Sequence, residues 1–164
     1  QTRPQHFLLA PVMTEVTQFF DLIIQQKDIA VDLLIPASTA LYADRDQVSV
    51  ILRNLFSNAL KFSYAGGRVE VVAANVEERI AIRITDYGTG MSPVQVKTLF
   101  TAQQFPGYGT DGERGTGLGL ILCKEFIDMN TGYIDVESTP GQGTTFTIML
   151  GKGNVPVSEL TVAG

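Results

Sequence analysis

Two asparagines and a lysine lie at helical spacing in one stretch of the chain, and together they could hold a metal ion and a phosphate. Asn54, Asn58 and Lys61 follow each other at steps of four and three residues, so their side chains project as one ridge along a helix. An amide oxygen is a hard, neutral ligand for magnesium, and a lysine ammonium neutralises phosphate as a point charge. A solvated helix face that carries asparagine twice would give the same pattern.

A carboxylate followed by two glycines forms the second candidate. Asp86 comes directly after an apolar stretch, and Gly88 and Gly90 follow it at alternate positions. A carboxylate at a strand end is an acceptor fixed in position, and glycines leave the backbone bare enough to contact a flat ligand. An Asp-Gly turn without a function is the rival interpretation.

The third candidate is the segment 114–120, RGTGLGL, which opens a predicted helix. Glycines at a helix start let free backbone amides and the positive end of the helix dipole approach phosphate oxygens. The spacing fits neither the dinucleotide fingerprint nor the P-loop, so a phosphate site here would belong to another fold. A hinge without a ligand remains the alternative. The preceding stretch, 101–115, has four glycines and little periodicity, which is typical of a lid or of a disordered loop.

The elements that position these residues follow from hydrophobic periodicity. Apolar residues at three-and-four spacing predict a central helix over 46–62 that carries the asparagine ridge, with Asp44 placed to cap it. Alternating or Val- and Ile-rich segments predict strands, and the two at 68–74 and 79–85 should form a hairpin. The other expected strands are 6–10, 29–35, 41–42, 132–138 and 144–150, and the other expected helices are 11–27, 92–100 and 118–128.

Composition sets the limits on size and partners. A chain of 164 residues with 45% apolar composition is long enough for one core, so we expect one domain over 1–150 followed by a C-terminal tail, 151–164. The net charge is −5 and the Lys and Arg residues do not cluster, which argues against nucleic acid and against direct membrane contact.

The single cysteine and the hydropathy of the chain indicate which cellular compartment it occupies. Cys123 is the only cysteine, so it cannot form an internal disulfide, which suits a reducing compartment. No apolar run reaches the roughly 18 residues of a membrane span. Because the first residue is Gln, we expect a cytoplasmic piece of a longer protein, whose remainder could be anchored in a membrane.

In their order and intervals these features resemble the catalytic ATP-binding domain of sensor histidine kinases, within a superfamily that includes gyrase, the Hsp90 chaperones and MutL. The resemblance covers about residues 6–150, and it rests on NLFSNALKF, DYGTGM, the pair Leu99-Phe100, RGTGLGL and GQGTTF. It implies an α+β fold, a two-layer α/β sandwich in which a mixed sheet packs on three helices beneath a mobile ATP lid. It also implies ATP and Mg²⁺ as ligands, held between the central helix and the lid.

The resemblance also implies roles for individual residues. Asn58 would be the magnesium ligand with Asn54 supporting it, Lys61 would reach the phosphates, and Asp86 would accept the adenine amino hydrogen. The other implied ligand contacts are Gly88 and Gly90 close to the base, Phe62 and Met91 as apolar walls, Thr144 through a hydroxyl or a bridging water, and Arg114, Gly115, Thr116, Gly117, Leu118, Gly119 and Leu120 around the phosphates. Phe100 would pack beneath the lid.

The residue one helical turn before the magnesium ligand separates kinases from hydrolases. ATP-hydrolysing members of the superfamily carry Glu there as a base for water, whereas this chain has Asn54, which is no base. The pattern therefore favours transfer of the γ-phosphoryl to another acceptor. We interpret the only histidine, His6, as structural, so the acceptor would lie on a separate dimerisation domain, and a response-regulator receiver would be the next partner.

Two other functions stay open at this point. An ATP-driven clamp of the gyrase or chaperone kind would hydrolyse ATP without a partner, and a nucleotide sensor or docking module would bind without transfer. The chain also departs from the kinase pattern at two places. MNTG at 129–132 stands where a His-Gly-Gly-like turn is usual, and the last strand ends in Leu150-Gly151 rather than Leu-Pro.

Overall fold

The computed structural model describes residues 1–100 and 118–156, and it contains the elements that the sequence predicts in the same order. The strands are β1 (Gln5–Leu8), β2 (Ala30–Leu34), β3 (Ala40–Ala43), β4 (Arg68–Val76), β5 (Arg79–Asp86), β6 (Tyr133–Thr139) and β7 (Gly143–Lys152). The helices are α1 (Leu9–Phe19), α2 (Asp21–Lys27), α3 (Arg45–Phe62), α4 (Pro93–Thr98) and α5 (Leu118–Met129). The predicted lid over 101–115 lies outside the described residues.

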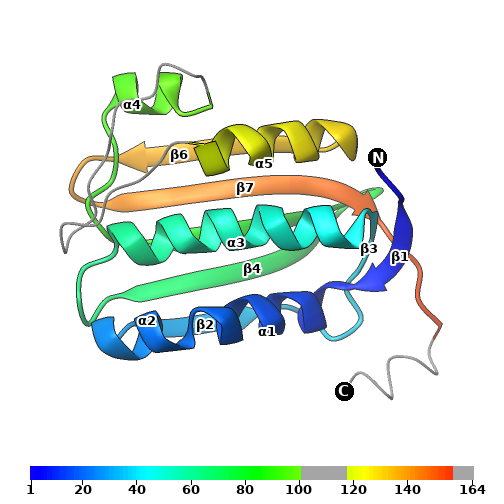
Figure 1. Ribbon diagram of the computed structural model, residues 1–164, viewed down its shortest axis with the longest axis horizontal. Helices are drawn as coiled ribbons and strands as arrows, with labels where there is room; N and C mark the ends of the chain where they lie inside the picture. The colour runs from blue at the N-terminus through cyan, green and yellow to red at the C-terminus, as the bar shows by residue number, and fades with distance from the viewer. Residues whose placement is uncertain (101–117, 157–164) are drawn as a thin grey trace.

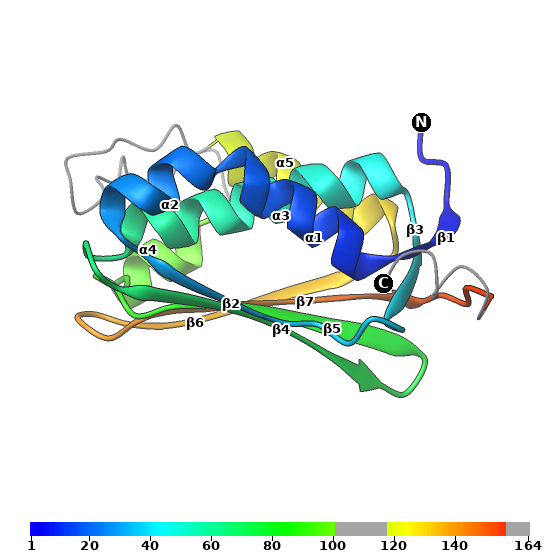
Figure 2. The same ribbon diagram turned by 90° about the horizontal axis from the view of Figure 1, so that it is seen from below.

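The molecule has two layers, a seven-stranded sheet and a layer of helices on one of its faces (Figures 1 and 2). The sheet order is β1-β3-β7-β5-β4-β2, and β6 pairs with the same edge of β7 as β3 does. β2 and β4 are parallel and the other pairs are antiparallel, so the sheet is mixed, as predicted. The α1–α2 pair, α3 and α5 form the three rows of the predicted helical layer, and α4 lies beyond one end.

The core lies between the layers and is centred on α3. Val48, Ile51, Leu52 and Leu55 are fully buried, and they pack against apolar residues of β4, β5 and β7. On β6, the residues at even positions are partly buried and those at odd positions are exposed, so the opposite face of the sheet faces solvent. The strand alternation therefore assigns each side chain near the sheet's end to one face or the other.

The start of α3 is fixed by a buried polar network that explains one departure from the family pattern. Asp44 caps the helix by accepting from the Gln47 amide at 3.0 Å, as predicted. The Asp44 amide donates to Asn130 Oδ1 at 2.8 Å, and Asn130 Nδ2 donates to Gln47 Oε1 at 2.8 Å. Asn130 therefore joins the turn after α5 to the start of α3, which gives the MNTG turn a structural role.

The first predicted helix was wrong in its start and its continuity. We expected a strand over 6–10 and one helix over 11–27, but α1 begins at Leu9 and the helix breaks at Phe20. Phe20 has φ −102° and ψ 14°, and its ring packs 5.9 Å from that of Phe56 in the core. Packing of this aromatic side chain accompanies a break that helical periodicity does not reveal, because the apolar spacing continues across it.

The last strand extends past residue 150, where we expected the domain to end. β7 runs to Lys152, which pairs with Leu41 of β3, so the first two residues of the expected tail belong to the sheet. The Asn154 amide donates to His6 Nδ1 at 3.1 Å, and the His6 ring lies 4.6 Å from that of Tyr42, contacts that support a structural role for this histidine. None of the described helices is long and apolar enough to cross a membrane.

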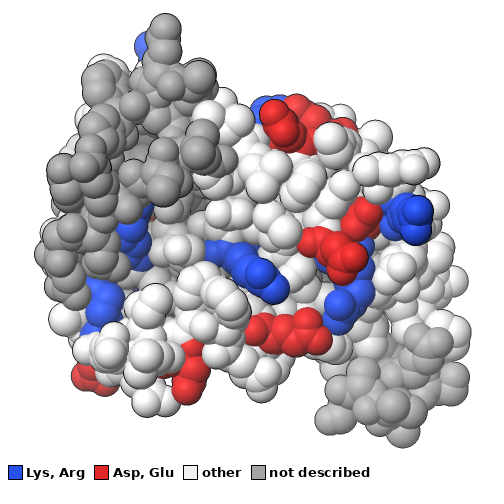
Figure 3. Space-filling view, in the orientation of Figure 1, with Lys and Arg blue, Asp and Glu red and all other residues white. Residues whose placement is uncertain are grey.

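Charged side chains are interspersed on the helical face of the molecule. Figure 3 shows basic and acidic residues there in small groups among uncharged ones, with neither sign forming a broad field among the described residues of this face.

Candidate functional site

Asp86 is a buried carboxylate at the last position of β5. It is 4% exposed, and its Oδ1 accepts from the Gly88 amide at 3.0 Å. Burial raises the pKa of Asp86 to about 6, against hydrogen bonds from the backbone amides of Gly88 and Thr144, which lower it. At neutral pH the chain therefore holds a desolvated negative charge at the end of its sheet, an arrangement that is typical of functional sites.

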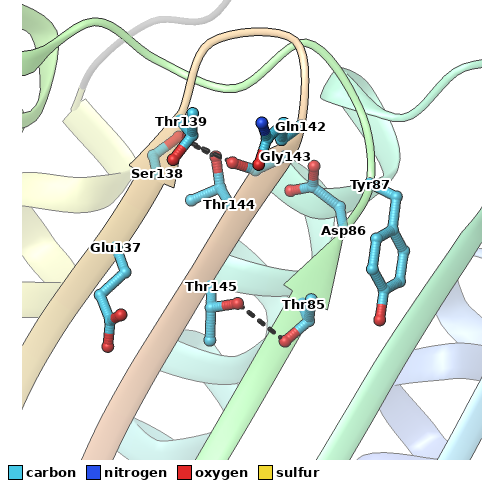
Figure 4. A pocket seen from close by; sticks show the side chains of 10 residues that line it. All are labelled: Thr85, Asp86, Tyr87, Glu137, Ser138, Thr139, Gln142, Gly143, Thr144 and Thr145. Atoms are coloured by element: carbon cyan, nitrogen blue, oxygen red, sulfur yellow. Dashed lines mark hydrogen bonds between the residues drawn. The ribbon is translucent and has the colours of Figure 1, made fainter.

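Three polar residues form a row across the sheet end and share its helix-facing side. Thr144 of β7 is paired with Asp86 of β5 on one edge and with Ser138 of β6 on the other. The Ser138 and Thr144 hydroxyl oxygens lie 2.8 Å apart (Figure 4). All three residues help to line a cavity of about 200 Å³ at the sheet end, together with residues of the opposite face such as Thr85, Glu137 and Thr145.

The loop after Asp86 is attached to the C-terminal end of α3. The Thr89 amide donates to the Phe62 carbonyl at 3.1 Å, and a Cβ added to Gly88 would overlap the same carbonyl oxygen. Gly88 is therefore required for close packing on α3, whereas its predicted contact with a base remains a prediction. The attachment brings the carboxylate-bearing end of β5 next to the C-terminal end of the asparagine-bearing helix.

Gly90 is also required for close packing of the backbone. Its φ is +67°, and an added Cβ would overlap the Thr139 carbonyl in the β6–β7 turn. Its neighbour Met91 donates its amide to Ser138 Oγ at 2.8 Å, and its side chain packs partly buried against the core. Both ends of the D-x-G-x-G segment are thus held by the sheet and by α3.

The two asparagines on α3 differ in their hydrogen bonds. Asn54 Nδ2 donates to the Val50 carbonyl at 2.9 Å, and a Cβ added to Gly119 would overlap Asn54 Oδ1. The glycine therefore lets the start of α5 rest directly on Asn54. Asn58 is half-buried, and its carboxamide has no hydrogen-bond partner within 1–100 and 118–156. Lys61 Nζ lies 4.8 Å from the centre of the Phe62 ring.

The glycine-rich segment is only partly described. Arg114, Gly115, Thr116 and Gly117 fall outside the described residues, so their predicted roles remain predictions. Leu118 begins α5, and the Leu120 side chain is 7% exposed and belongs to the core. Any contact of Leu120 with a ligand would therefore be through its backbone.

Sequence reasoning missed two residues that shape the site, Lys27 and Ser138. Lys27 is 5% exposed, and its Nζ donates to the carbonyls of Leu60 and Lys61 at 2.9 and 3.2 Å. A cation at these carbonyls stabilises the end of α3. No sequence pattern distinguishes Lys27 from a solvated helix-end lysine, whereas Ser138 could have been found by registering the hairpin around Pro140-Gly141.

Few side chains among the described residues could hold a metal ion. No group of three or more His, Cys, Asp or Glu residues in the described part of the chain could hold a metal ion. Asn58 offers one neutral amide oxygen, and magnesium prefers six oxygen ligands in an octahedron. The donor set fits a Mg²⁺ ion that brings most of its ligands as phosphate oxygens and water, and it does not fit a site made by protein alone.

Comparison with known proteins decides the family. Residues 43–154 match the family described as histidine kinase-, DNA gyrase B-, and HSP90-like ATPase. The chain belongs to this family. The match includes α3, the Asp86 loop, α5 and the β6–β7 hairpin, so it covers every element that builds the site.

Within this ATPase family the chain is a catalytic domain of the sensor histidine kinase type. It is 38% identical over 116 residues to the circadian input-output histidine kinase CikA of Synechocystis sp., which is 70% of this chain and 15% of that protein. It is 36% identical over 110 residues to the sensor protein SrrB of Staphylococcus aureus, which is 66% of this chain and 19% of that protein. The chain therefore spans less than a fifth of the curated relatives it matches.

Solved structures show the same fold. The catalytic domain of histidine kinase ThkA superposes with a TM-score of 0.80 over 92% of this chain and 96% of that domain, at 22% identity. ThkA in complex with the response regulator protein TrrA gives a TM-score of 0.75 over 92% of this chain and 42% of that one, at 19% identity. The predicted α+β sandwich of a histidine kinase catalytic domain is thus confirmed.

Proposed function

We propose that this domain binds ATP with Mg²⁺ at the end of its sheet and transfers the γ-phosphoryl group to a histidine on a separate dimerisation domain. The observation that carries the proposal is the hydrogen bond from the Thr89 amide to the Phe62 carbonyl. It joins the Asp86 loop to the helix end that carries Asn58 and Lys61, so one extended ligand can reach a base acceptor and a phosphate-binding ridge.

Different residues bind the base, the phosphates and the metal ion. The ionised Asp86 carboxylate accepts from the exocyclic amine of adenine, while guanine presents an oxygen there, which is another acceptor. Lys61 neutralises phosphate charge, and Asn58, whose carboxamide has no partner among the described residues, offers its oxygen to the metal. Bound Mg²⁺ would supply charge neutralisation on the phosphate oxygens.

Transfer, rather than hydrolysis, follows from Asn54. Its Nδ2 is bound to the Val50 carbonyl and its Oδ1 abuts Gly119, and a carboxamide does not accept a proton near neutral pH. Water in the site is therefore not activated by this residue. In the proposed step an imidazole nitrogen of the acceptor attacks the γ-phosphorus, the bond to the β–γ bridging oxygen breaks, and ADP leaves with that electron pair.

The partners and the location belong to the proposal as well. A dimerisation domain of the same kinase would carry the accepting histidine, and the aspartate of a response-regulator receiver would take the group next. A complex of the kinase ThkA with the response regulator TrrA supports the second partner by fold likeness. We place the domain in the cytoplasm, where ATP is available.

Calorimetry and a transfer assay test the proposal. Titration with ATP, with and without Mg²⁺, should show binding that magnesium strengthens. Labelled ATP should then label a histidine-bearing helical hairpin domain added in trans, and it should label no residue of the chain alone. Binding without transfer to any hairpin would favour a nucleotide sensor, and rapid hydrolysis by the isolated chain that is lost in Asn54→Ala would favour a clamp.

A further inference from the structure

Ser138 lies at the centre of three hydrogen bonds, and the identity of its partners fixes the direction of each. The Met91 backbone amide can only donate, and it lies 2.8 Å from Ser138 Oγ. The Gly143 carbonyl can only accept, and it lies 2.9 Å from the same oxygen. A serine hydroxyl has one proton, so that proton is used for Gly143.

The third bond, between Ser138 and Thr144, must then use the proton of Thr144. The two hydroxyl oxygens are 2.8 Å apart, and Ser138 has no second proton to give. Ser138 accepts from Met91 and from Thr144, which fills both of its lone pairs. The Thr144 hydroxyl is thereby fixed with its proton toward β6, and only its acceptor lone pairs remain for other partners.

Thr144 shares its face of the sheet with Asp86, its register partner on β5. Both residues are buried, at 6% and 4% exposure, and both line the cavity at the sheet end (Figure 4). An ionised carboxylate is an acceptor alone. The sheet end therefore presents two neighbouring acceptors, and Ser138 is the reason that the second one cannot also donate.

We propose that Ser138 is a positioning residue that sets purine selectivity: by holding the proton of Thr144, it makes the site require hydrogen-bond donors from the ligand. This inference rests on the proposed nucleotide function. A 6-aminopurine supplies donors at its amine to both acceptors, directly or through a bridging water. A 6-oxopurine presents an oxygen there that meets lone pairs at both, and its one donor on this edge is moved to the neighbouring N1–H. A buried polar site rejects a ligand that leaves its groups unpaired.

The test compares ATP with inosine triphosphate, which has an oxygen in place of the amine and no 2-amino group. Affinities of the full chain for both nucleotides are measured by calorimetry with Mg²⁺, for the wild type and for Ser138→Ala. Because the variant frees the Thr144 proton to turn toward the oxygen of the base, the preference for ATP should fall about three- to tenfold. Ser138→Thr retains the hydroxyl and should retain the preference.

Thr85→Ala is the matched control. Thr85 and Thr145 form a hydroxyl pair 3.0 Å apart on the opposite face of the sheet. Both residues also line the cavity at the sheet end, but within the described part of the chain their hydroxyls bond to each other and not to Ser138 or Thr144. Removing that pair should leave the preference for ATP unchanged. Equal losses of affinity for both nucleotides in Ser138→Ala, or an equal change of preference in Thr85→Ala, would show that Ser138 only holds the strands together.

A second variant keeps the inference testable should Ser138→Ala not fold. Thr144→Val removes the acceptor and preserves the shape, so it should weaken ATP binding while leaving inosine triphosphate binding unchanged or stronger. Equal weakening of both would overturn the inference. Failure of the proposed function is distinguishable, because the wild-type chain would then bind neither nucleotide.

Discussion

Replacing Asp86 by Asn should stabilise the domain while it weakens nucleotide binding. Burial raises the pKa of this carboxyl from the ordinary 3.8 to about 6. At about 1.4 kcal/mol per pKa unit, the ionised form costs about 3 kcal/mol of unfolding free energy. Below pH 3.8 both the folded and the unfolded state carry the proton. As the pH rises to 6 the unfolded state loses its proton first, so stability falls, and above pH 6 the full cost is present.

The pH profile of the Asp86→Asn variant isolates this cost. Asn has the same shape and no charge, and the other carboxyls contribute equally to both proteins. Urea unfolding between pH 4 and pH 8 should therefore show a free-energy difference that grows in favour of the variant, by about 2 kcal/mol, between pH 4 and pH 7. A constant offset, for example from an amide group turned toward the Gly88 N–H, leaves that slope intact. Parallel pH profiles for the two proteins would refute the reasoning.

The ATP affinity of the Asp86→Asn variant is the second quantity to measure. The variant replaces an acceptor by a group that also donates, so ATP affinity should fall by about 1–3 kcal/mol. Higher stability and lower affinity in the variant are expected if Asp86 serves ligand binding at a cost in folding stability. Unchanged affinity by calorimetry would remove Asp86 from the base-binding site.

Three further outcomes follow from the geometry. Adenosine, which has no group that titrates between pH 5 and pH 8, should bind more weakly below pH 6 because protonated Asp86 loses acceptor capacity. Gly119→Ala should weaken Mg-ATP binding without large loss of stability, since its Cβ displaces Asn54 while the helix gains about 1 kcal/mol of propensity. Lys27→Met should lower the unfolding free energy by about 2–3 kcal/mol, because the last carbonyls of α3 lose a buried cation.

Each of these outcomes has a contrary result. Adenosine affinity that is constant from pH 5 to pH 8 would show that Asp86 does not accept from the ligand. Full Mg-ATP affinity in Gly119→Ala would show that Asn54 can move without consequence. Lys124→Met removes a lysine that is paired with Asp128 at an exposed position, so it should cost less than about 1 kcal/mol. Equal costs at Lys27 and Lys124 would contradict the capping role.

The parts of the fold that the sequence predicted are those set by local signals. The Asp44 cap and periodicity located α3, the alternating strands located the β4–β5 hairpin, and Ser92 with Pro93 located α4, which has the reciprocal cap with Gln95. These signals act within a few residues, so no tertiary information is needed to recognise them.

The parts that the sequence did not predict depend on contacts between distant segments. The break at Phe20 accompanies packing on Phe56, and the burial of Lys27 depends on the carbonyls of a helix more than thirty residues further along the chain. Gly88 illustrates the same limit, because its close packing on the Phe62 carbonyl was not predicted from the sequence, while its predicted contact with a base remains a prediction. Sequence spacing indicates that a glycine is needed, and only the fold shows what approaches it.

Calorimetric titration of Asn58→Ala with ATP, in the presence and absence of Mg²⁺, tests the central proposal most directly. The wild type should bind ATP more tightly with Mg²⁺ than without it. The variant should keep its affinity for metal-free ATP and lose the increase that magnesium gives, because Asp86 still holds the base while the metal loses the Asn58 oxygen. An undiminished magnesium effect in the variant would contradict the proposal that α3 and the end of β5 hold the same nucleotide.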